Sequence, residues 1–162
     1  MGAILLVSII IAIFIFGFSS RLNAQPQNDA KVDRYETGRK TLEQITGTSG
    51  TQVIQSLQDI TPDLADWIIE FAYGDVFSRP GLDLRSRELV TVAALTAMGN
   101  STPQLKVHIN GALNVGCQPE EIIETILQMS VYAGFPASIN GINAAREVFQ
   151  ERGVKLSEQK SN

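Results

Sequence analysis

The stretch DLRSRELVTVAALTAMGNSTPQLKVHINGALNVG, residues 83–116, contains two helix patterns separated by a short polar connection. Asp83 is placed to cap the first helix, which is charged only near its start and then apolar on nearly every side until Gly99. We therefore expect this helix to be central, with its C-terminal part buried all round. Thr102 and Pro103 predict the start of the second helix, because proline is tolerated in a first helical turn.

The second helix holds the single histidine of the chain, His108, on a face shared with Leu105, Ile109 and Ala112. Glu88 precedes it by 108 − 88 = 20 residues, in the first turns of the preceding helix. Two antiparallel helices joined by the short GNSTP connection would bring these two side chains together. A histidine beside a carboxylate can hold a proton near neutral pH and deliver it in a set direction. The alternative is a partly buried histidine that only hydrogen-bonds a neighbouring helix.

Outward from these two helices, the same signals predict an all-α chain, because no run of strand-like alternation occurs. One helix is expected from about Lys31 to the GTSG sequence, and another after Thr61 as its cap. Downstream, Gln118 and Glu121 open a further helix, and FPASINGINAAREVFQERG supplies the last. The residues expected to face the core are Leu64, Trp67, Ile68 and Phe71 after Thr61, and Ile139, Ile142, Ala145, Val148 and Phe149 in the last helix.

Charge and cysteine content exclude several classes of function. The formal net charge is −4 and no run of Lys or Arg occurs, so nucleic acid is not an expected partner. A single cysteine, Cys117, rules out an intrachain disulfide, a CxxC redox motif and a multi-cysteine zinc site. We therefore predict no metal site.

The N-terminus begins with an apolar run, residues 3–18, which is somewhat short for a membrane span. Together with a possible cleavage site at Ala24, it predicts an exported protein, periplasmic or secreted. The alternative is an uncleaved membrane anchor, and only then would the membrane be a partner. The predicted organisation is a signal peptide at 1–24, a linker at 25–30, a single domain at 31–153 and a polar tail at 154–162.

The segments FAYGDVFSRPGLDLRSRELVTVAALTAMG, LKVHINGALNVGCQPEEIIETILQMSVYAGFPA and AAREVF resemble the carboxymuconolactone decarboxylase family, from about Tyr35 to Phe149. The resemblance implies an alkylhydroperoxidase D-like, all-α domain of about six to seven helices. It also implies a homo-oligomer, a trimer or hexamer associating through helix faces. The implied active site lies between helices and uses no metal or organic cofactor.

The same superfamily has a thiol branch, in which a CxxC motif precedes the helix histidine by one turn. In this chain Ser101 and Gln104 occupy the two cysteine positions, while Glu88 and His108 match the glutamate and histidine of that branch. Disulfide exchange needs one thiolate to attack and a second to resolve. Thiol peroxidase activity of the peroxiredoxin type is therefore disfavoured.

The resemblance instead implies a lyase that removes carbon dioxide from a small carboxylated lactone or a related acid. We expect His108 to donate the proton and Glu88 to orient it, with Arg87 or Arg85 binding substrate carboxylates. Arg87 matches the family pattern better, and Arg85 lies one turn from Glu88, so the choice stays open; all three also fit a solvated first turn. The competing function is a non-catalytic, oligomeric small-molecule binding protein. Trp67, Tyr73 and Tyr132 are candidate pocket walls, although such aromatic residues more often belong to the core or to a subunit interface.

Overall fold

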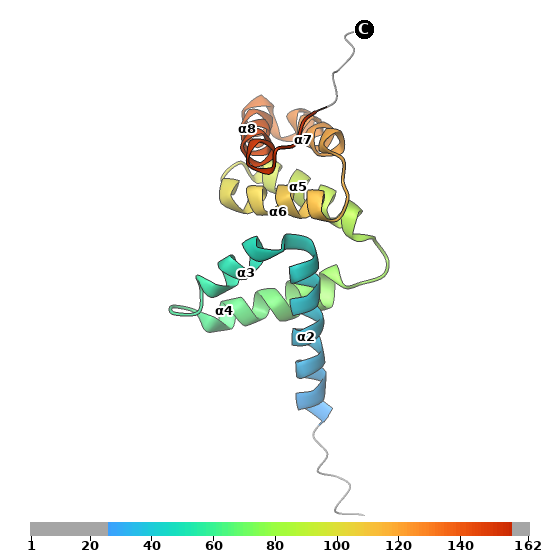
Figure 1. Cartoon of the computed structure of the whole chain (residues 1–162), viewed down its shortest axis with the longest axis vertical. Helices are drawn as coiled ribbons and strands as arrows, with labels where there is room; N and C mark the ends of the chain where they lie inside the picture. Colours follow the sequence, from blue (N-terminus) through green and yellow to red (C-terminus); the bar gives the residue numbers. More distant parts are fainter. Residues whose placement is uncertain (1–25, 157–162) are drawn as a thin grey trace, which may run out of the picture. The chain divides into compact units, whose positions relative to one another are not determined.

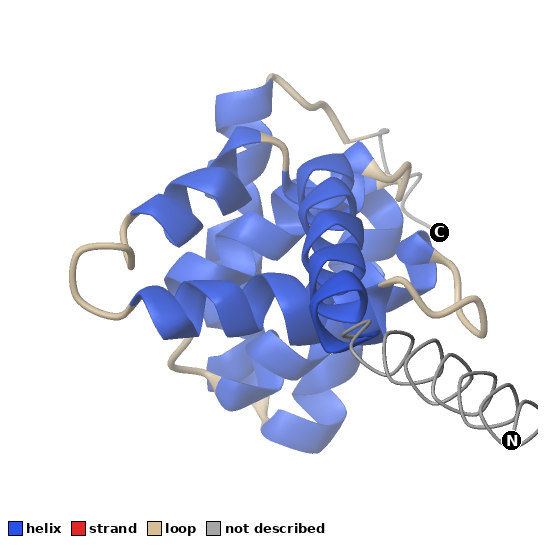
Figure 2. Cartoon of the chain, turned by 90° about the horizontal axis from the view of Figure 1, so that it is seen from below, coloured by secondary structure: helices blue, strands red, loops and turns tan. Residues whose placement is uncertain are grey.

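The computed structural model describes residues 26–156, and these residues form helices joined by short connections (Figure 1). No strand occurs among them (Figure 2), which confirms the predicted all-α class. No helix within this range is both long and apolar enough to cross a membrane. The expected signal peptide or anchor lies outside the described residues, so export stays a prediction. The elements are α2 (Pro26–Thr46), α3 (Thr48–Gln55), α4 (Pro62–Trp67), the π-helical η1 (Ile68–Phe77), α5 (Leu84–Met98), α6 (Thr102–Asn114), α7 (Pro119–Ala133) and α8 (Phe135–Arg152).

Helices α5 to α8 pack against one another within the compact unit that begins at Arg34. Their shared core is apolar and contains residues of all four helices, so burial of this surface is what holds the bundle together. The cysteine of the chain belongs to the same core, as expected for a small packing residue. The buried residues of this core are Val92, Leu105, Ile109, Ala112, Cys117, Ile122, Ile126, Ala144, Ala145, Val148 and Phe149.

A second core lies among α2, α3, α4 and η1 in the same unit. Helices α2 and η1 approach so closely that a side chain at Gly38 would collide with the carbonyl oxygen of Ile69. Gly74 provides the matching gap on η1, where an added Cβ would lie 2.5 Å from the carbonyl oxygen of Arg34. The two glycines therefore let these helix backbones meet. The buried residues of the second core are Leu42, Ile45, Ile54, Ala65, Ile69 and Tyr73.

The predicted ends of α5 agree with the structure. The Asp83 carboxylate accepts a hydrogen bond from the backbone N–H of Ser86 (2.9 Å), and Gly99 ends the helix with φ +72°. Helix α6 begins one residue earlier than expected, since Thr102 is already helical and Ser101 takes the cap position. These ends fix how far α5 and α6 run beside each other.

Of the apolar stripe expected on the core side after Thr61, Ile68 packs against the second core as predicted, but the other three residues face outward. Leu64, Trp67 and Phe71 are 40%, 63% and 62% exposed. The chain is π-helical from Ile68, and its wider winding replaces the 3.6-residue period on which the prediction rested. The buried face recurs every fourth residue, at Ala65, Ile69 and Tyr73.

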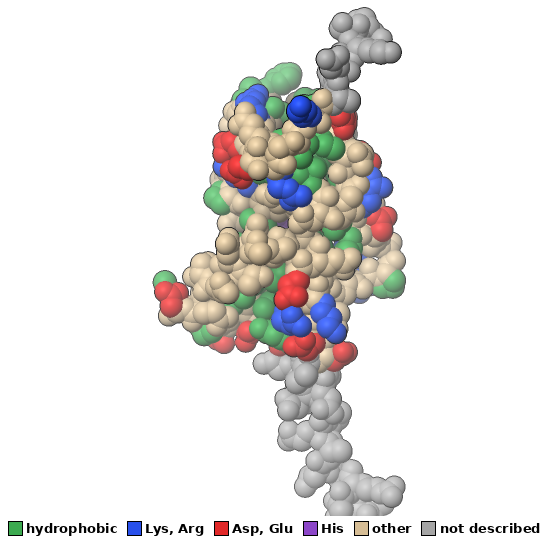
Figure 3. Space-filling model, in the orientation of Figure 1, with side chains coloured by type: hydrophobic (Ala, Val, Ile, Leu, Met, Phe, Trp, Pro, Cys, Tyr) green, Lys and Arg blue, Asp and Glu red, His purple; other side chains and the backbone are tan. Residues whose placement is uncertain are grey.

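The prediction that the C-terminal part of α5 is buried on every side is also wrong. Helices α6, α7 and α8 all contact α5, yet Val90 and Met98 remain 62% and 61% exposed. Ile139 of α8, expected in the core, is 59% exposed. Figure 3 shows hydrophobic side chains reaching the surface on the face that it draws. The rest of the face predicted for α8 is confirmed, since Ala145, Val148 and Phe149 are buried in the core and Ile142 packs against it.

Two boundaries differ from the predicted organisation. Helix α2 begins at Pro26, so residues 26–30, expected in the linker, are helical. Val154, assigned to the polar tail, packs against the core of the α5–α8 bundle. Its backbone N–H also donates to the carbonyl oxygen of Phe149 (2.9 Å), which extends the folded region past the last helix.

Candidate active site

Glu88 and His108 form a direct pair between α5 and α6, as their spacing predicted. Nδ1 of His108 lies 3.0 Å from Oε2 and 3.3 Å from Oε1 of the Glu88 carboxylate. The Glu88 side chain is fully buried, and the His108 side chain is 17% exposed. With its proton on Nδ1, the imidazole donates to the carboxylate, which fixes the ring orientation. Nε2 is then the ring nitrogen that can exchange a proton with a bound molecule.

Gly111 makes room for the Glu88 carboxylate. A Cβ added at Gly111 would lie 2.8 Å from Oε2 of Glu88 and 3.0 Å from Cγ2 of Ile45. Both distances are too short for ordinary carbon contacts, so a larger residue would displace the carboxylate or the helix. Gly111 was not among the predicted site residues, although a helical glycine one turn after the histidine is a usable signal of close approach.

His108 lines a cavity of about 320 Å³, the His108 cavity, which lies among residues of α2, α3, η1, α5 and α6. The ring of Phe77 lies 6.5 Å from the imidazole and 5.1 Å from the ring of Tyr73, measured between centroids. Most of the wall is hydrocarbon. The lining residues are Leu42, Gly50, Val53, Ile54, Ile68, Ala72, Tyr73, Phe77, Thr91, Pro103, Gln104, Val107 and His108.

Of the three aromatic residues predicted as walls, only Tyr73 lines the His108 cavity. Burial, and to a lesser extent the negative charge of Glu88, raise the pKa of Tyr73, so its phenol stays protonated. Trp67 and Tyr132 are 63% and 77% exposed and do not line the His108 cavity, so the prediction for them is wrong. Aromatic type alone did not distinguish a wall from a surface residue.

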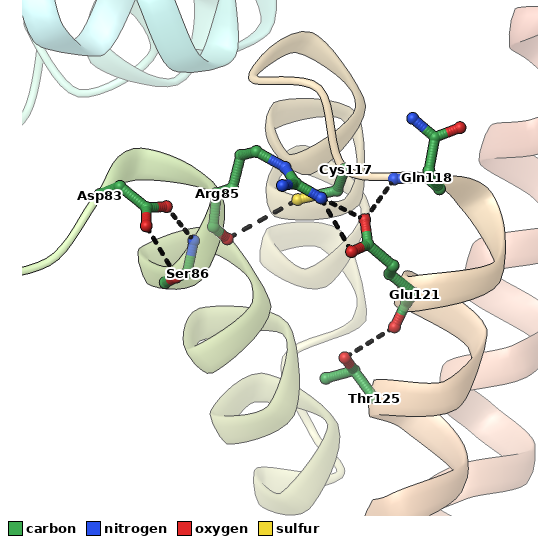
Figure 4. A network of polar contacts seen from close by, with 7 residues as sticks. All are labelled: Asp83, Arg85, Ser86, Cys117, Gln118, Glu121 and Thr125. Carbon is green, nitrogen blue, oxygen red and sulfur yellow. Dashed lines mark hydrogen bonds and ion pairs between the residues drawn. The ribbon is translucent and has the colours of Figure 1, made fainter.

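Neither predicted substrate-binding arginine lines the His108 cavity. Arg85 points toward Glu121 (Figure 4), and its Nη2 donates to both carboxylate oxygens of that residue at 2.8 and 2.6 Å. Arg87 donates from Nε to the carbonyl oxygen of Leu82 (3.1 Å) and from Nη2 to that of Arg79 (2.9 Å). These contacts orient both guanidinium groups within the fold. A role in substrate binding stays a prediction.

The thiol of Cys117, the single cysteine of the chain, is poorly suited to redox chemistry. Cys117 is 3% exposed, and its Sγ lies 3.6 Å from the carbonyl oxygen of Arg85 (Figure 4). Burial raises the pKa of the Cys117 thiol, which disfavours the nucleophilic thiolate. Among residues 26–156, no group of three or more His, Cys, Asp or Glu is arranged to hold a metal ion.

Comparisons with known proteins show what this chain is similar to. A sequence profile described as the Carboxymuconolactone decarboxylase family matches residues 62–147. A 4-carboxymuconolactone decarboxylase of Acinetobacter baylyi is 37% identical over 122 residues, covering 75% of this chain and 90% of that protein. A nitrosuccinic acid decarboxylase of Metarhizium robertsii is 29% identical over 120 residues, 72% of this chain and 82% of that protein. An uncharacterized 15.0 kDa protein of Paracoccus denitrificans is 34% identical over 99 residues, 60% and 74% of the two chains.

Proposed function

Because this chain belongs to the carboxymuconolactone decarboxylase family, we propose that it is a decarboxylase acting on a small carboxylated lactone or related acid. His108 is the proposed proton donor, and Glu88 is the residue that orients it. The single observation that carries the proposal is the Glu88–His108 pair, 3.0 Å apart, at the wall of an apolar cavity of about 320 Å³.

The names of two relatives indicate a common kind of chemistry. One acts on 4-carboxymuconolactone and the other on nitrosuccinic acid. Each name combines a carboxylic acid with an electron-withdrawing group, a lactone in one and a nitro group in the other. Such a group accepts the electron pair when the carbon–carbon bond to the carboxylate breaks. We propose that the substrate of this chain has the same two features.

In the proposed reaction His108 and Glu88 have different roles. Cleavage releases carbon dioxide and leaves an electron pair delocalised into the electron-withdrawing group. Nε2 of the protonated His108 ring donates a proton to the resulting anion, which leaves a neutral imidazole, and a proton from water then restores the imidazolium. Glu88, held beside Nδ1, stabilises the protonated ring before transfer. Each of these steps uses residues of this chain alone.

The apolar wall favours the same reaction. A carboxylate is strongly solvated in water, and its charge is dispersed as carbon dioxide forms. Side chains such as Phe77, Val107 and Ile54 replace that water with hydrocarbon. The concentrated charge of the reactant therefore loses more solvation than the dispersed charge of the transition state. Burial of Glu88 makes its interaction with His108 stronger for the same reason.

We also propose that the protein works as a homo-oligomer. Large apolar side chains on three surfaces are exposed, and exposed apolar area of this extent usually marks an interface. One surface follows α4 and η1, another lies on α5, and the third spans α7 and α8. The residues concerned are Leu64, Trp67 and Phe71; Val90 and Met98; and Leu127, Val131, Tyr132, Phe135 and Ile139.

The catalytic proposal is tested by measuring the rate of carbon dioxide release from two acids that each carry an electron-withdrawing group, 4-carboxymuconolactone and 3-oxohexanoate. Each rate is corrected for the spontaneous reaction. We expect His108→Gln and Glu88→Gln each to lower kcat/KM roughly 100-fold for any substrate that is turned over. Glu124→Gln, a matched change at an exposed residue of α7, should leave kcat/KM unchanged. Ligand binding without turnover in the wild type would instead favour the non-catalytic binding protein.

A further inference from the structure

Few polar side chains reach the apolar interior of the His108 cavity. The lining side chains that carry a polar group are Tyr73, Thr91, Gln104 and His108. The Thr91 hydroxyl donates to a backbone carbonyl oxygen one turn earlier (2.9 Å), and Nδ1 of His108 faces Glu88. Gln104 is exposed, whereas Tyr73 is buried. Among the described residues, the side-chain polar groups left to face a ligand inside the cavity are therefore the Tyr73 hydroxyl and Nε2 of His108.

The Tyr73 hydroxyl has no hydrogen-bond partner among the described residues, although Tyr73 is only 6% exposed. Among the described side chains, Oγ1 of Thr96 is the one polar atom that is both sealed from solvent and without a hydrogen-bond partner. The Tyr73 hydroxyl is therefore not sealed in the core, and the space that its side chain lines is the His108 cavity. A buried tyrosine hydroxyl usually has a partner, so we expect its partner to be a molecule inside the cavity.

Packing and a backbone contact hold Tyr73 in place. Its ring packs on the ring of Phe77, with 5.1 Å between centroids, and Phe77 in turn lies 6.5 Å from the imidazole of His108. The backbone carbonyl oxygen of Tyr73 accepts a hydrogen bond from Oγ of Ser78 (2.6 Å). Burial raises the pKa of Tyr73, so the hydroxyl keeps its proton. A neutral donor that is fixed in this way needs little reorganisation when negative charge develops beside it.

We propose that the Tyr73 hydroxyl donates a hydrogen bond to an oxygen of the electron-withdrawing group of the substrate, a role that rests on the proposed decarboxylase function. As the carbon–carbon bond to the carboxylate breaks, carbon dioxide leaves and the electron pair is delocalised onto that oxygen. The hydrogen bond strengthens with the negative charge, but the phenolic proton stays on Tyr73. The electron pair then forms a carbon–hydrogen bond with the proton from His108. Tyr73 thus stabilises the developing charge, and His108 supplies the proton.

Tyr73→Phe tests this role, because it removes the hydroxyl and keeps the ring that packs on Phe77. For an acid that the wild type decarboxylates, we expect kcat to fall roughly 100-fold and KM to change less than about threefold, since the hydrogen bond strengthens only as charge develops. Tyr35→Phe is the matched control. Tyr35 packs against the same core but does not line the cavity, so kcat should stay near the wild-type value. An unchanged kcat in Tyr73→Phe would overturn the proposal.

A second measurement detects the hydrogen bond without turnover. It uses γ-valerolactone, an uncharged lactone whose carbonyl stretching band is separate from the amide bands of the protein. When this lactone is bound to the full-length wild type, its band should lie at lower frequency than in the Tyr73→Phe complex, because a hydrogen bond weakens the carbonyl double bond. The variant should also bind the lactone about three- to tenfold more weakly by calorimetric titration. The same band position in both proteins, or no binding by the wild type at about 10 mM, would overturn the proposal.

The two measurements distinguish failure of this proposal from failure of the proposed function. His108-dependent turnover of 4-carboxymuconolactone or 3-oxohexanoate that is unaffected by Tyr73→Phe would support the function and refute the role of Tyr73. A carbonyl band that depends on Tyr73, without His108-dependent turnover of either acid, would refute the proposed function and support the hydrogen-bond donor at Tyr73.

Discussion

At the scale of single residues, the contact between Glu88 and His108 depends on the absence of a side chain at Gly111. We expect Gly111→Ala to push the Glu88 carboxylate away from His108, because the new Cβ would lie 2.8 Å from Oε2. The loss of orientation should lower kcat roughly 10- to 100-fold, and the overpacking should reduce stability by about 1–3 kcal/mol. Steady-state kinetics and denaturant unfolding measure the two effects.

Gly141→Ala is the matched control for this substitution. Its Cβ would be equally crowded, 2.8 Å from Cγ2 of Ile126 and 3.0 Å from Cγ2 of Thr96, within α8 and away from the pair. Stability should fall to a similar extent while kcat stays near the wild-type value. A similar loss of kcat in both variants would mean that crowding in the bundle, and not displacement of Glu88, limits the reaction.

The sequence predicted the contact between Glu88 and His108 but not the direction of the two arginine side chains. The distance along the chain between Glu88 and His108, with a short connection between their helices, was enough to predict their contact, and the structure confirms that contact. The direction of Arg85 is decided by Glu121, 36 positions away in the sequence, which no local pattern reveals. The cavity walls from α2 and α3 were missed for the same reason, since they meet α6 only through the tertiary fold.

At the scale of elements, the starts of α5 and α7 depend on two ionised carboxylates. The backbone N–H of Ser86 lowers the pKa of Asp83, and the backbone N–H of Gln118, with the Arg85 guanidinium, lowers the pKa of Glu121. A carboxylate whose pKa is lowered by folding binds fewer protons in the folded state. Its contribution to stability is therefore complete above the unfolded pKa of about 4 and is lost as the pH falls through the folded pKa.

We accordingly expect Glu121→Gln to reduce the free energy of unfolding at pH 7 and to approach the wild type as the pH falls below about 4. The variant loses the ion pair with Arg85 and the negative charge of the capping-box acceptor, although its amide oxygen can still accept from the backbone N–H of Gln118. Both charge-dependent contacts also weaken in the wild type once Glu121 is protonated. Urea unfolding at several pH values measures the difference. Glu124→Gln on the same helix is the control, and a difference for Glu121→Gln that does not change with pH would contradict the assignment.

Capping signals predicted the helix ends better than periodicity predicted the buried faces. Asp83 and Gln118 cap their helices as expected, because a cap depends on backbone groups within a few residues. The outward direction of Trp67 and Phe71 depends on the π-helical winding from Ile68 and on which helix packs beside it. Neither factor is contained in a short window of sequence, so the stripe was recognised and its direction was not.

At the scale of the whole molecule, the outward-facing apolar residues predict assembly. Val131 on α7 and Phe135 at the start of α8 are 72% and 74% exposed, and Trp67 on α4 is 63% exposed. Covering these side chains with another copy of the chain would remove apolar area from water and stabilise the oligomer. We therefore expect residues 25–162 to sediment as an oligomer at micromolar concentration, and the resemblance to the family implies that it is a trimer or hexamer.

A charge introduced at Val131 tests whether this exposed residue lies in an interface between copies of the chain. Val131→Glu should shift the sedimentation equilibrium toward monomer at least about tenfold, because a buried, unpaired carboxylate disfavours the interface. Gln128→Glu, also exposed on α7, adds the same charge without removing an apolar contact and should have a smaller effect. A monomeric wild type, or equal shifts in the two variants, would contradict an interface at Val131. If Val131→Glu dissociates the oligomer but keeps kcat/KM, the Glu88–His108 pair and its cavity are sufficient within a single chain.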